Sequence, residues 1–287
     1  MKHHRLSVFV CLLLMLGLGL TEIFDETRAQ AAPSTLFVPS EIRLLVVSAS
    51  GNEKAGNILM DLATYGFNTT WHGVTSGTDY TTDPTTSNIN QYDVVILQDT
   101  QDGQPTQVTE KEVEHFTNTF KGVLIHTHRA LFLNETSGRL WGWTSNTMAK
   151  IERRLGVDFT GWAPISMQNG TFHRKSSLIN GLEYFMPFKV ARSLTTPNIN
   201  LNGATQLYNF TNDGGGGGIG ITYYRNTTGT VGIHIAGFYS HYGEPQTDVP
   251  YHLGLYGGKY QDVNADYLQK RSRFMAQLIA YALDKDF

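Results

Sequence analysis

The chain has 287 residues, of which 40% are hydrophobic and 16% are charged, as is typical of one soluble α/β domain or of one domain with an insertion. A chain of this length buries a large core, so its stability does not require disulfides or a structural metal. The formal net charge is -3 and no block of basic residues is present, which argues against nucleic acid as a partner.

The first 31 residues have the pattern of a secretory signal peptide. Basic residues at 2–5 precede an apolar stretch at 6–20, and Ala29–Gln30–Ala31 offers small residues at a cleavage site. The pattern divides the chain into three parts: a signal peptide over 1–31, an N-terminal extension over 32–40 and a folded domain over 41–287.

This leader predicts a secreted protein, located outside the cell or in a periplasm. An uncleaved N-terminal membrane anchor is the alternative, because the long acidic segment 21–28 separates the apolar stretch from the cleavage site. After cleavage no uniformly apolar stretch of membrane-spanning length remains in the sequence, so we expect no stable membrane span.

The only cysteine, Cys11, lies inside the predicted signal. The mature protein would therefore have no disulfide, no thiolate metal ligand and no cysteine nucleophile. Five Asn-x-Ser/Thr triplets are candidates for N-glycosylation of an exported protein, at Asn68, Asn134, Asn169, Asn209 and Asn226.

Apolar runs bounded by glycine, proline or polar residues predict the strands, and helical spacing predicts the helices. In the first half we expect a strand at 41–50, a helix at 53–66, strands at 67–74 and 92–100, a helix at 109–120 and a strand at 122–128. The 109–120 helix opens on Thr109 with Glu112 three residues on, a capping-box pattern.

Beyond residue 130 the pattern is looser. We expect a helix at 147–156, short strands and loops over 157–230, a flexible turn at 213–218, a buried strand at 230–238 and an amphipathic helix at 265–283. Strands that alternate with helices and read as continuous apolar runs indicate a parallel sheet covered by helices on both faces.

Ligands of open parallel sheets bind outside the carboxyl ends of the strands, so the residues that follow each strand are the site candidates. They are Ser48 to Asn52, Gln98–Asp99, His126–Thr127–His128–Arg129, and Gly237 to His241. His72 and His115 look instead like ordinary loop and helix-surface residues.

Several of these segments resemble the trehalose-utilisation (ThuA-like) proteins. GVLIHTHRA resembles their Gly-Gly-x-x-Gly-Ile-His-Ser-Ala stretch, with His128 at the family's histidine. Further matches follow in order over roughly 41–285: Trp141–Gly142–Trp143, the Leu-Gly-x-x-Phe segment at 155–159, the segment from His173 to Leu182 without the family's proline, GTVGIHIAGFYSHYGE, and the closing helix.

The resemblance implies the fold of class I glutamine amidotransferases: a flavodoxin-like three-layer α/β sandwich with a mostly parallel central sheet. In true amidotransferases a cysteine nucleophile follows a central strand, whereas here that region reads His126–Thr127–His128. Without a cysteine after Cys11, glutamine hydrolysis through a thiolate is excluded. The resemblance implies a sugar-related role instead.

His128 is the candidate general base, with Asp99 as the carboxylate that orients it. The alternative is that Asp99 only caps the turn after its strand. His126 and His128 flank Thr127 and share one face of a strand, so they could bind a metal if His241, Asp99 or His234 completed the set. Spacing alone favours the other interpretation, with one histidine buried against a backbone partner and the other at the surface; we therefore expect no cofactor.

The candidate ligand contacts each have a plain structural alternative. The guanidinium of Arg129 could bind a carboxylate or phosphate ligand, or it could form a salt bridge within the protein. Ser50 and Asn52 could bind an anion or a hydroxyl at a strand-to-helix turn, or they could cap that helix. Aromatic rings such as that of Trp143 suit the apolar faces of sugars, or pack in the core. The other two contacts are His126 and His241.

The sequence therefore predicts a secreted protein that binds or turns over a small carbohydrate at the carboxyl edge of its sheet. Two alternatives remain open: a non-catalytic extracellular binding or structural domain, and a metal-dependent hydrolase that uses His126, His128 and His241.

Overall fold

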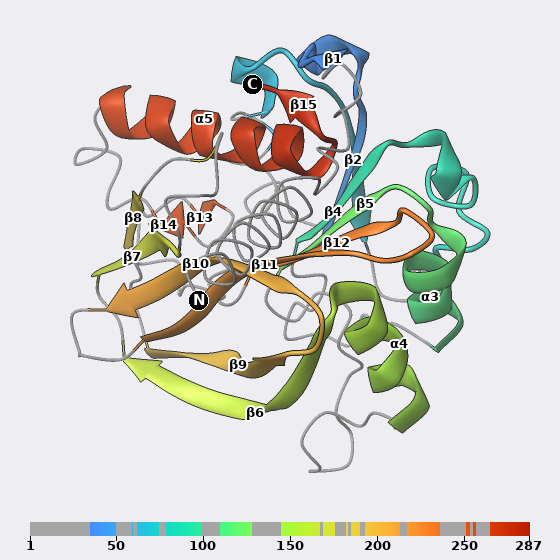
Figure 1. The fold of residues 1–287 in the computed structure, drawn as a ribbon. Helices are drawn as coiled ribbons and strands as arrows, with labels where there is room; N and C mark the ends of the chain where they lie inside the picture. Colours follow the sequence, from blue (N-terminus) through green and yellow to red (C-terminus); the bar gives the residue numbers. More distant parts are fainter. Residues whose placement is uncertain are drawn as a thin grey trace, which may run out of the picture. The chain divides into compact units, whose positions relative to one another are not determined.

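A nine-stranded mixed sheet forms the centre of the computed structural model (Figure 1). The structure describes residues 35–49, 59, 62–74, 79–98, 110–127, 145–166, 169–175, 182, 185–189, 193–212, 217–235, 251–252, 255–256 and 265–287. Residues Leu36–Phe287 form one compact unit, to which the sheet belongs.

Five neighbouring strands of this sheet are parallel. Across the sheet they lie in the order β3 (Asn68–Val74), β2 (Arg43–Ala49), β4 (Val94–Gln98), β5 (Val123–Thr127) and β12 (Val231–Ile235). Numbered along the chain this order is 2-1-3-4-5, which is the flavodoxin-like arrangement. The predicted fold class is confirmed.

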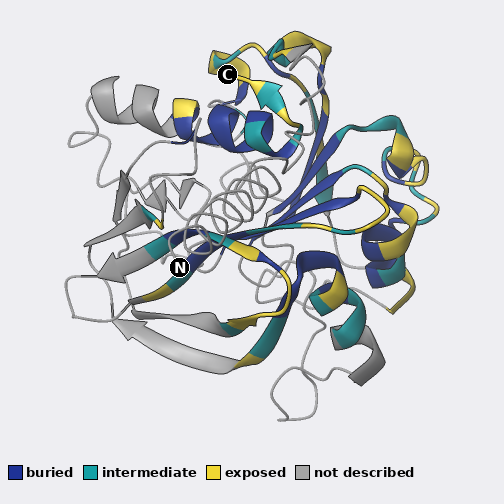
Figure 2. Ribbon diagram, viewed as in Figure 1, coloured by how far each residue is buried: buried dark blue, intermediate teal, exposed yellow. Residues whose placement is uncertain are grey.

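Strands β2, β4, β5 and β12 form because their apolar runs can be buried on both faces of the sheet, whereas β3 is a partly exposed edge strand. Every residue of β5 and β12 is buried, and the central parallel strands are drawn in the buried colour in Figure 2. The predicted strands at 41–50, 67–74, 92–100, 122–128 and 230–238 all exist, each within a few residues of the expected bounds.

Antiparallel strands extend the sheet beyond β12. They are, in order, β11 (Gly217–Arg225), β10 (Thr205–Asn212), β7 (Asn169–Arg174) and β8 (Phe185–Lys189). A separate two-stranded sheet pairs β6 (Val157–Ser166) with β9 (Ser193–Leu201). The other described strands are β1 (Thr35–Leu36), β13 (Tyr251–His252), β14 (Leu255–Tyr256) and β15 (Lys285–Asp286).

This region differs from the expectation of short strands and loops over 157–230. Strand β6 alone has 10 residues, and Gly217 and Gly218 belong to β11 rather than to a turn. The Thr- and Asn-rich composition hides these strands because they are long antiparallel partners with polar side chains, not buried apolar runs.

The described helices are α3 (Glu110–Glu114), which continues into a π-helical turn η3 (His115–Thr119), α4 (Ser145–Leu155) and α5 (Ala265–Ala282), with 3-10 turns η1 (Pro39–Glu41) and η2 (Ile89–Gln91). Of the expected helix at 53–66, residues 59 and 62–64 are described and are helical. Helix α4 ends as predicted at Gly156, whose φ of +64° suits a glycine after the last turn. Among the described residues, no helix combines the length and apolar character needed to cross a membrane.

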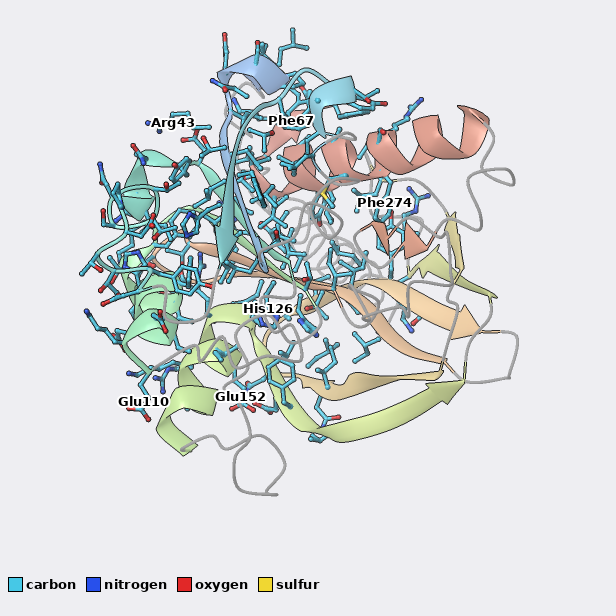
Figure 3. All side chains as sticks on the ribbon, turned by 180° about the vertical axis from the view of Figure 1, so that it is seen from behind. Arg43, Phe67, Glu110, His126, Glu152 and Phe274 are labelled. Carbon is cyan, nitrogen blue, oxygen red and sulfur yellow. The ribbon has the colours of Figure 1, made fainter. Side chains whose placement is uncertain are left out.

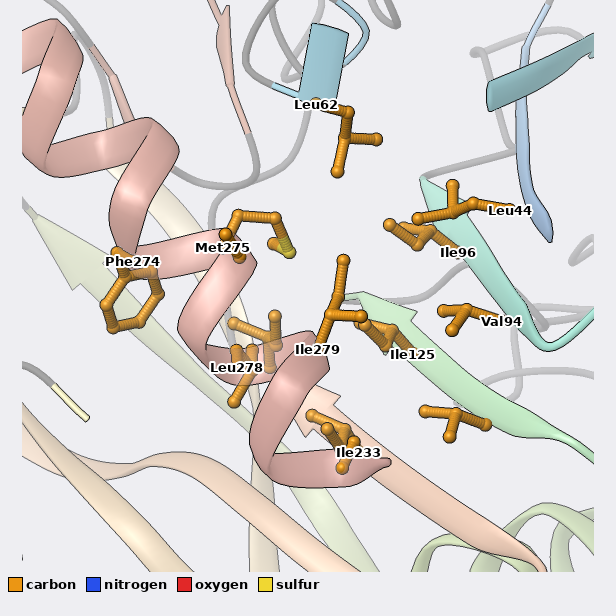
Figure 4. Close-up of a cluster of buried hydrophobic side chains, with 14 of the residues drawn as sticks. Leu44, Leu62, Val94, Ile96, Ile125, Ile233, Phe274, Met275, Leu278 and Ile279 are labelled. Carbon is orange, nitrogen blue, oxygen red and sulfur yellow. The ribbon is translucent and has the colours of Figure 1, made fainter. Parts of the chain in front are cut away.

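The two faces of the sheet bury separate clusters. On one face Phe274, Met275, Leu278 and Ile279 of α5 pack against strand residues such as Ile125 (Figure 4). On the other face, Val113 of α3, Phe116 of η3 and Ile151 and Leu155 of α4 pack against Leu45, Val95, Leu97 and Leu124. Helix, sheet and helix form the predicted three layers.

His72 and His115 are not where the sequence suggests. His72 lies on β3, and His115 is buried with its Nε2 atom 2.8 Å from the carbonyl oxygen of Thr86. Buried Thr86 also donates to the Tyr80 carbonyl, so the segment that contains both residues packs over the helix face that carries His115. A contact between segments this far apart in the sequence leaves no mark in the helical pattern.

Candidate functional site

The order of the strands locates a switch point between β2 and β4. Strand β3 lies on one side of β2, while β4, β5 and β12 continue on the other side. In folds with this order, ligands bind in the crevice outside the carboxyl ends of the two strands at the switch point. Ser50 and Asn52 follow β2 in sequence, and Asp99 follows β4.

Two buried histidines lie near the carboxyl ends of the next two parallel strands. His126 of β5 and His234 of β12 are register partners, and both are fully buried (Figure 3 marks His126). Their Nδ1 atoms are 3.0 Å apart, and the ring centroids are 5.2 Å apart with a tilt of 33°. The side chains therefore form a direct imidazole–imidazole hydrogen bond across the sheet.

Backbone alternation sets the face on which the pair lies. His126 is two residues from Leu124, which belongs to the cluster under α3, η3 and α4, whereas Ile125 packs under α5. The ring of Phe159, from β6, packs edge-to-face on His234 at 5.4 Å and 90°. The pair is thus enclosed on the α4 side of the sheet.

The geometry limits the protonation of the pair. Two Nδ1 atoms at 3.0 Å can hold only one proton between them, so one ring donates and the other accepts. Burial lowers the pKa of His234 to about 3, although its hydrogen bond with His126 acts in the opposite direction. At neutral pH His234 is therefore a neutral imidazole.

Two hydroxyl groups at the same strand ends have partners inside the protein. Thr127 Oγ1 donates to the Leu97 carbonyl at 2.7 Å and ties β5 to β4. Ser48 is fully buried, and its Oγ accepts a hydrogen bond from Trp71 Nε1 at 3.0 Å. These contacts stabilise the carboxyl ends of the parallel strands.

Most of the predicted site residues lie outside the described residues. These are the candidate catalytic pair His128 and Asp99 and the candidate contacts Ser50, Asn52, Arg129, Trp143 and His241. Their roles remain predictions. His126 is described, and it is buried with the imidazole of His234 as a hydrogen-bond partner.

Sequence reasoning considered His234 only as an additional metal ligand and missed its pairing with His126. The signal was present, since VLIHT and VGIHI carry histidine at the same position of two buried strands. The match is informative only when β5 and β12 are known to lie side by side in the sheet. Among the described residues there is no group of three or more His, Cys, Asp or Glu side chains that could hold a metal.

A polar pocket at the opposite, amino-terminal ends of β2 and β3 is less suited to chemistry. It has a volume of about 200 Å³ and is lined by Arg43, Leu44, Asn68, Thr70, Gln91 and Tyr92. The guanidinium of Arg43 is already neutralised by Asp93, with Nη2 to Oδ1 at 2.8 Å and Nε to Oδ2 at 3.2 Å. The guanidinium that lines this pocket is therefore already paired within the fold.

Four of the five sequon asparagines are described. Asn68 lies on β3, Asn169 on β7 and Asn209 on β10, where the Oδ1 of Asn209 accepts from Gln206 Nε2. Asn226 lies in the turn between β11 and β12, where its Oδ1 accepts hydrogen bonds from Thr228 and Thr230. Asn134 is outside the described residues.

No protein-family model matches the chain, and no curated protein does either. Solved structures with a similar fold include a cold-adapted β-galactosidase from Rahnella sp. R3, with 13% identity, a TM-score of 0.47, and coverage of 90% of this chain and 33% of that chain. The chain thus spans about a third of the length of that enzyme.

Two further solved structures with a similar fold have lower TM-scores. A glutamine amidotransferase from Thermotoga maritima has 9% identity and a TM-score of 0.43, with coverage of 84% of this chain and 96% of that chain. A carbohydrate deacetylase has 11% identity and a TM-score of 0.38, with coverage of 69% and 30%. All three TM-scores are below 0.5, so the fold assignment rests on the strand order and layers described above.

Proposed function

We propose that the protein binds or turns over a carbohydrate at the carboxyl ends of its parallel strands. In this proposal it is a secreted ThuA-like protein of the class I glutamine amidotransferase-like superfamily that lacks amidotransferase activity. The resemblance of the segments around His128 and Trp143 to ThuA-like proteins supports the choice of ligand.

The observation that carries the location is the His126–His234 pair. Burying two imidazoles in a sheet removes their polar atoms from water, which costs free energy that the burial of apolar side chains does not. Polar networks of this kind cluster at functional sites, and this one lies near the carboxyl ends of β5 and β12, the edge of the sheet at which folds of this order bind their ligands.

The chemistry of the site follows from the residue types available. No cysteine follows Cys11, so no thiolate can attack a substrate. His128 comes two residues after His126 and can act as a general base near neutral pH, with the Asp99 carboxylate orienting it. The neutral ring of His234 adds no positive charge to this edge of the sheet.

Binding is tested by thermal shift and calorimetry against a panel of mono- and disaccharides. A ligand that raises the melting temperature of the wild-type protein should lose its effect in His128→Ala. The matched control is Arg43→Ala, at the pocket on the opposite edge, which should keep it. The reverse pattern would assign the ligand to the Arg43 pocket, and no shift across the panel would contradict the carbohydrate proposal.

A non-catalytic binding or structural domain is the second candidate, because the cysteine of the superfamily is missing. Sugar binding without any turnover, with the wild type and His128→Ala equally inert, would favour it. A metal-dependent hydrolase would require His126, His128 and His241 together. Elemental analysis of purified protein showing no stoichiometric metal would exclude this third candidate.

Export is part of the proposal and has its own test. The mature protein is expected to begin after residue 31, which the mass of the secreted chain would reveal. Glycosylation at Asn226, on a turn, would appear as a mass loss on enzymatic deglycosylation that Asn226→Gln abolishes. A full-length intracellular chain would contradict secretion.

A further inference from the structure

Two buried polar atoms lie side by side on the α4 face of the sheet without a hydrogen-bond partner. They are Thr222 Oγ1 on β11 and His234 Nε2 on β12, and neither side chain has any exposed surface. A buried polar atom that pairs with nothing loses its hydration without compensation, so native proteins almost always satisfy such groups.

The two residues are direct cross-strand partners. Thr222 pairs with His234 in the antiparallel register of β11 and β12, and His234 pairs with His126 in the parallel register of β12 and β5. Directly opposed residues point to the same face, with Cβ atoms about 4.5–5.5 Å apart. Thr222, His234 and His126 therefore form one polar row across three strands.

The histidine pair restricts what can satisfy His234 Nε2. If His234 donates its Nδ1 proton to His126, its neutral ring has a bare Nε2 that needs a donor; if it accepts, Nε2 carries the proton and needs an acceptor. A partner that both donates and accepts suits either tautomer. The hydroxyl of Thr222 has the same dual character, so one such molecule can serve both atoms.

The size and the surroundings of the site further limit which molecule can pair with Thr222 Oγ1 and His234 Nε2. Both side chains are closed to solvent, so a sugar or any other extended ligand cannot reach them. The neighbouring ring of Phe159 is apolar and offers at best a weak contact to the edge of His234. Water is small and dual in character, and buried waters are held by two to four polar groups.

We propose that Thr222 and His234 hold one buried water molecule, which completes a hydrogen-bonded row from Thr222 through His234 to His126. This internal hydration site does not depend on what the carboxyl edge binds. It joins the antiparallel extension of the sheet to the histidine pair beneath the candidate site.

A crystal structure with ordered solvent tests the site directly. One density peak is expected about 2.7–3.0 Å from both Thr222 Oγ1 and His234 Nε2. The proposal is overturned if no peak is present and the Thr222 hydroxyl donates to a carbonyl oxygen instead.

Variants make the test specific. Thr222→Val keeps the shape of the side chain but removes the hydroxyl, and it should eliminate or displace the peak. Thr127→Val is the matched control, because that buried hydroxyl has its own protein partner in Leu97 and should leave the peak in place. A peak that survives Thr222→Val unmoved, or that disappears equally in Thr127→Val, would overturn the assignment.

Imidazole nitrogen NMR gives a second measurement that needs no crystals. The Nε2 resonance of His234 should shift in Thr222→Val and stay unchanged in Thr127→Val. No shift in Thr222→Val would show that His234 Nε2 does not share a partner with Thr222. If Thr222→Val does not fold, the density in the wild-type crystal alone decides.

Discussion

Acid should destabilise the protein through the buried pair of His126 and His234. The folded-state pKa of His234 is lowered by burial to about 3, whereas a histidine in the unfolded chain titrates near its ordinary value of 6.5. Between these two values the unfolded chain binds a proton that the folded protein does not. The stabilisation is therefore complete above about pH 6.5 and is lost as the pH falls towards 3.

The loss expected at pH 5 follows from the two pKa values. At that pH the unfolded imidazole lies about 1.5 pH units below its own pKa, while the folded ring of His234 is still neutral. Each unit corresponds to about 1.4 kcal/mol, so the free energy of unfolding should fall by about 2 kcal/mol from pH 7 to pH 5. Because the two rings share one proton, this loss belongs to the pair.

Urea denaturation at pH 7 and pH 5 measures the loss. Wild type and His234→Gln are compared, since glutamine can still form hydrogen bonds but does not titrate. The drop between the two pH values should be smaller by about 2 kcal/mol in His234→Gln, whatever the variant's absolute stability. Thr127→Val, which leaves both rings in place, should keep the wild-type drop. Equal drops in wild type and His234→Gln would refute the conclusion that His234 is buried as a neutral ring.

Two further predictions concern packing on the two faces of the sheet, and urea denaturation checks both. A Cβ atom at Gly232 would lie 2.1 Å from the Arg154 carbonyl oxygen, so Gly232→Ala should push α4 off β12 and cost about 3 kcal/mol or more. Gly229→Ala has open space but a φ of +85°, so it should cost only about 1–2 kcal/mol, and a reversed ranking would contradict the contact. On the other face, Leu278→Ala in α5 should cost about 2–5 kcal/mol, and half-buried Leu283→Ala clearly less. Equal costs for these two leucines would mean that α5 does not cover the sheet.

The parallel half of the fold was predictable because its signals are local. Strand β5 reads VLIHT, an apolar run that is typical of a strand buried on both faces of a sheet. Helix α5 repeats its apolar residues at helical spacing. Glycine at 156 ends α4 because few other residues adopt its backbone conformation. In each case the residues that carry the signal are also the residues that form the element.

The antiparallel half was not predictable in this way. Strands such as β6 and β9 are stabilised by each other, over nine paired positions that span residues 157–201, and their polar residues resemble loops when read singly. The burial of His115 has the same origin, since its cover comes from Thr86, 29 residues away.

The sequence alone determined that the chain has a covered parallel sheet, that polar residues follow its strands and that no thiolate chemistry is available after Cys11. Only the tertiary structure decided that His126 meets His234 and that Thr222 lies beside them. Alternation along one strand says which face a side chain occupies, but the neighbour on that face is set by which strands lie side by side. That choice depends on the global packing of the sheet and its helices, across 108 residues of chain for the histidine pair.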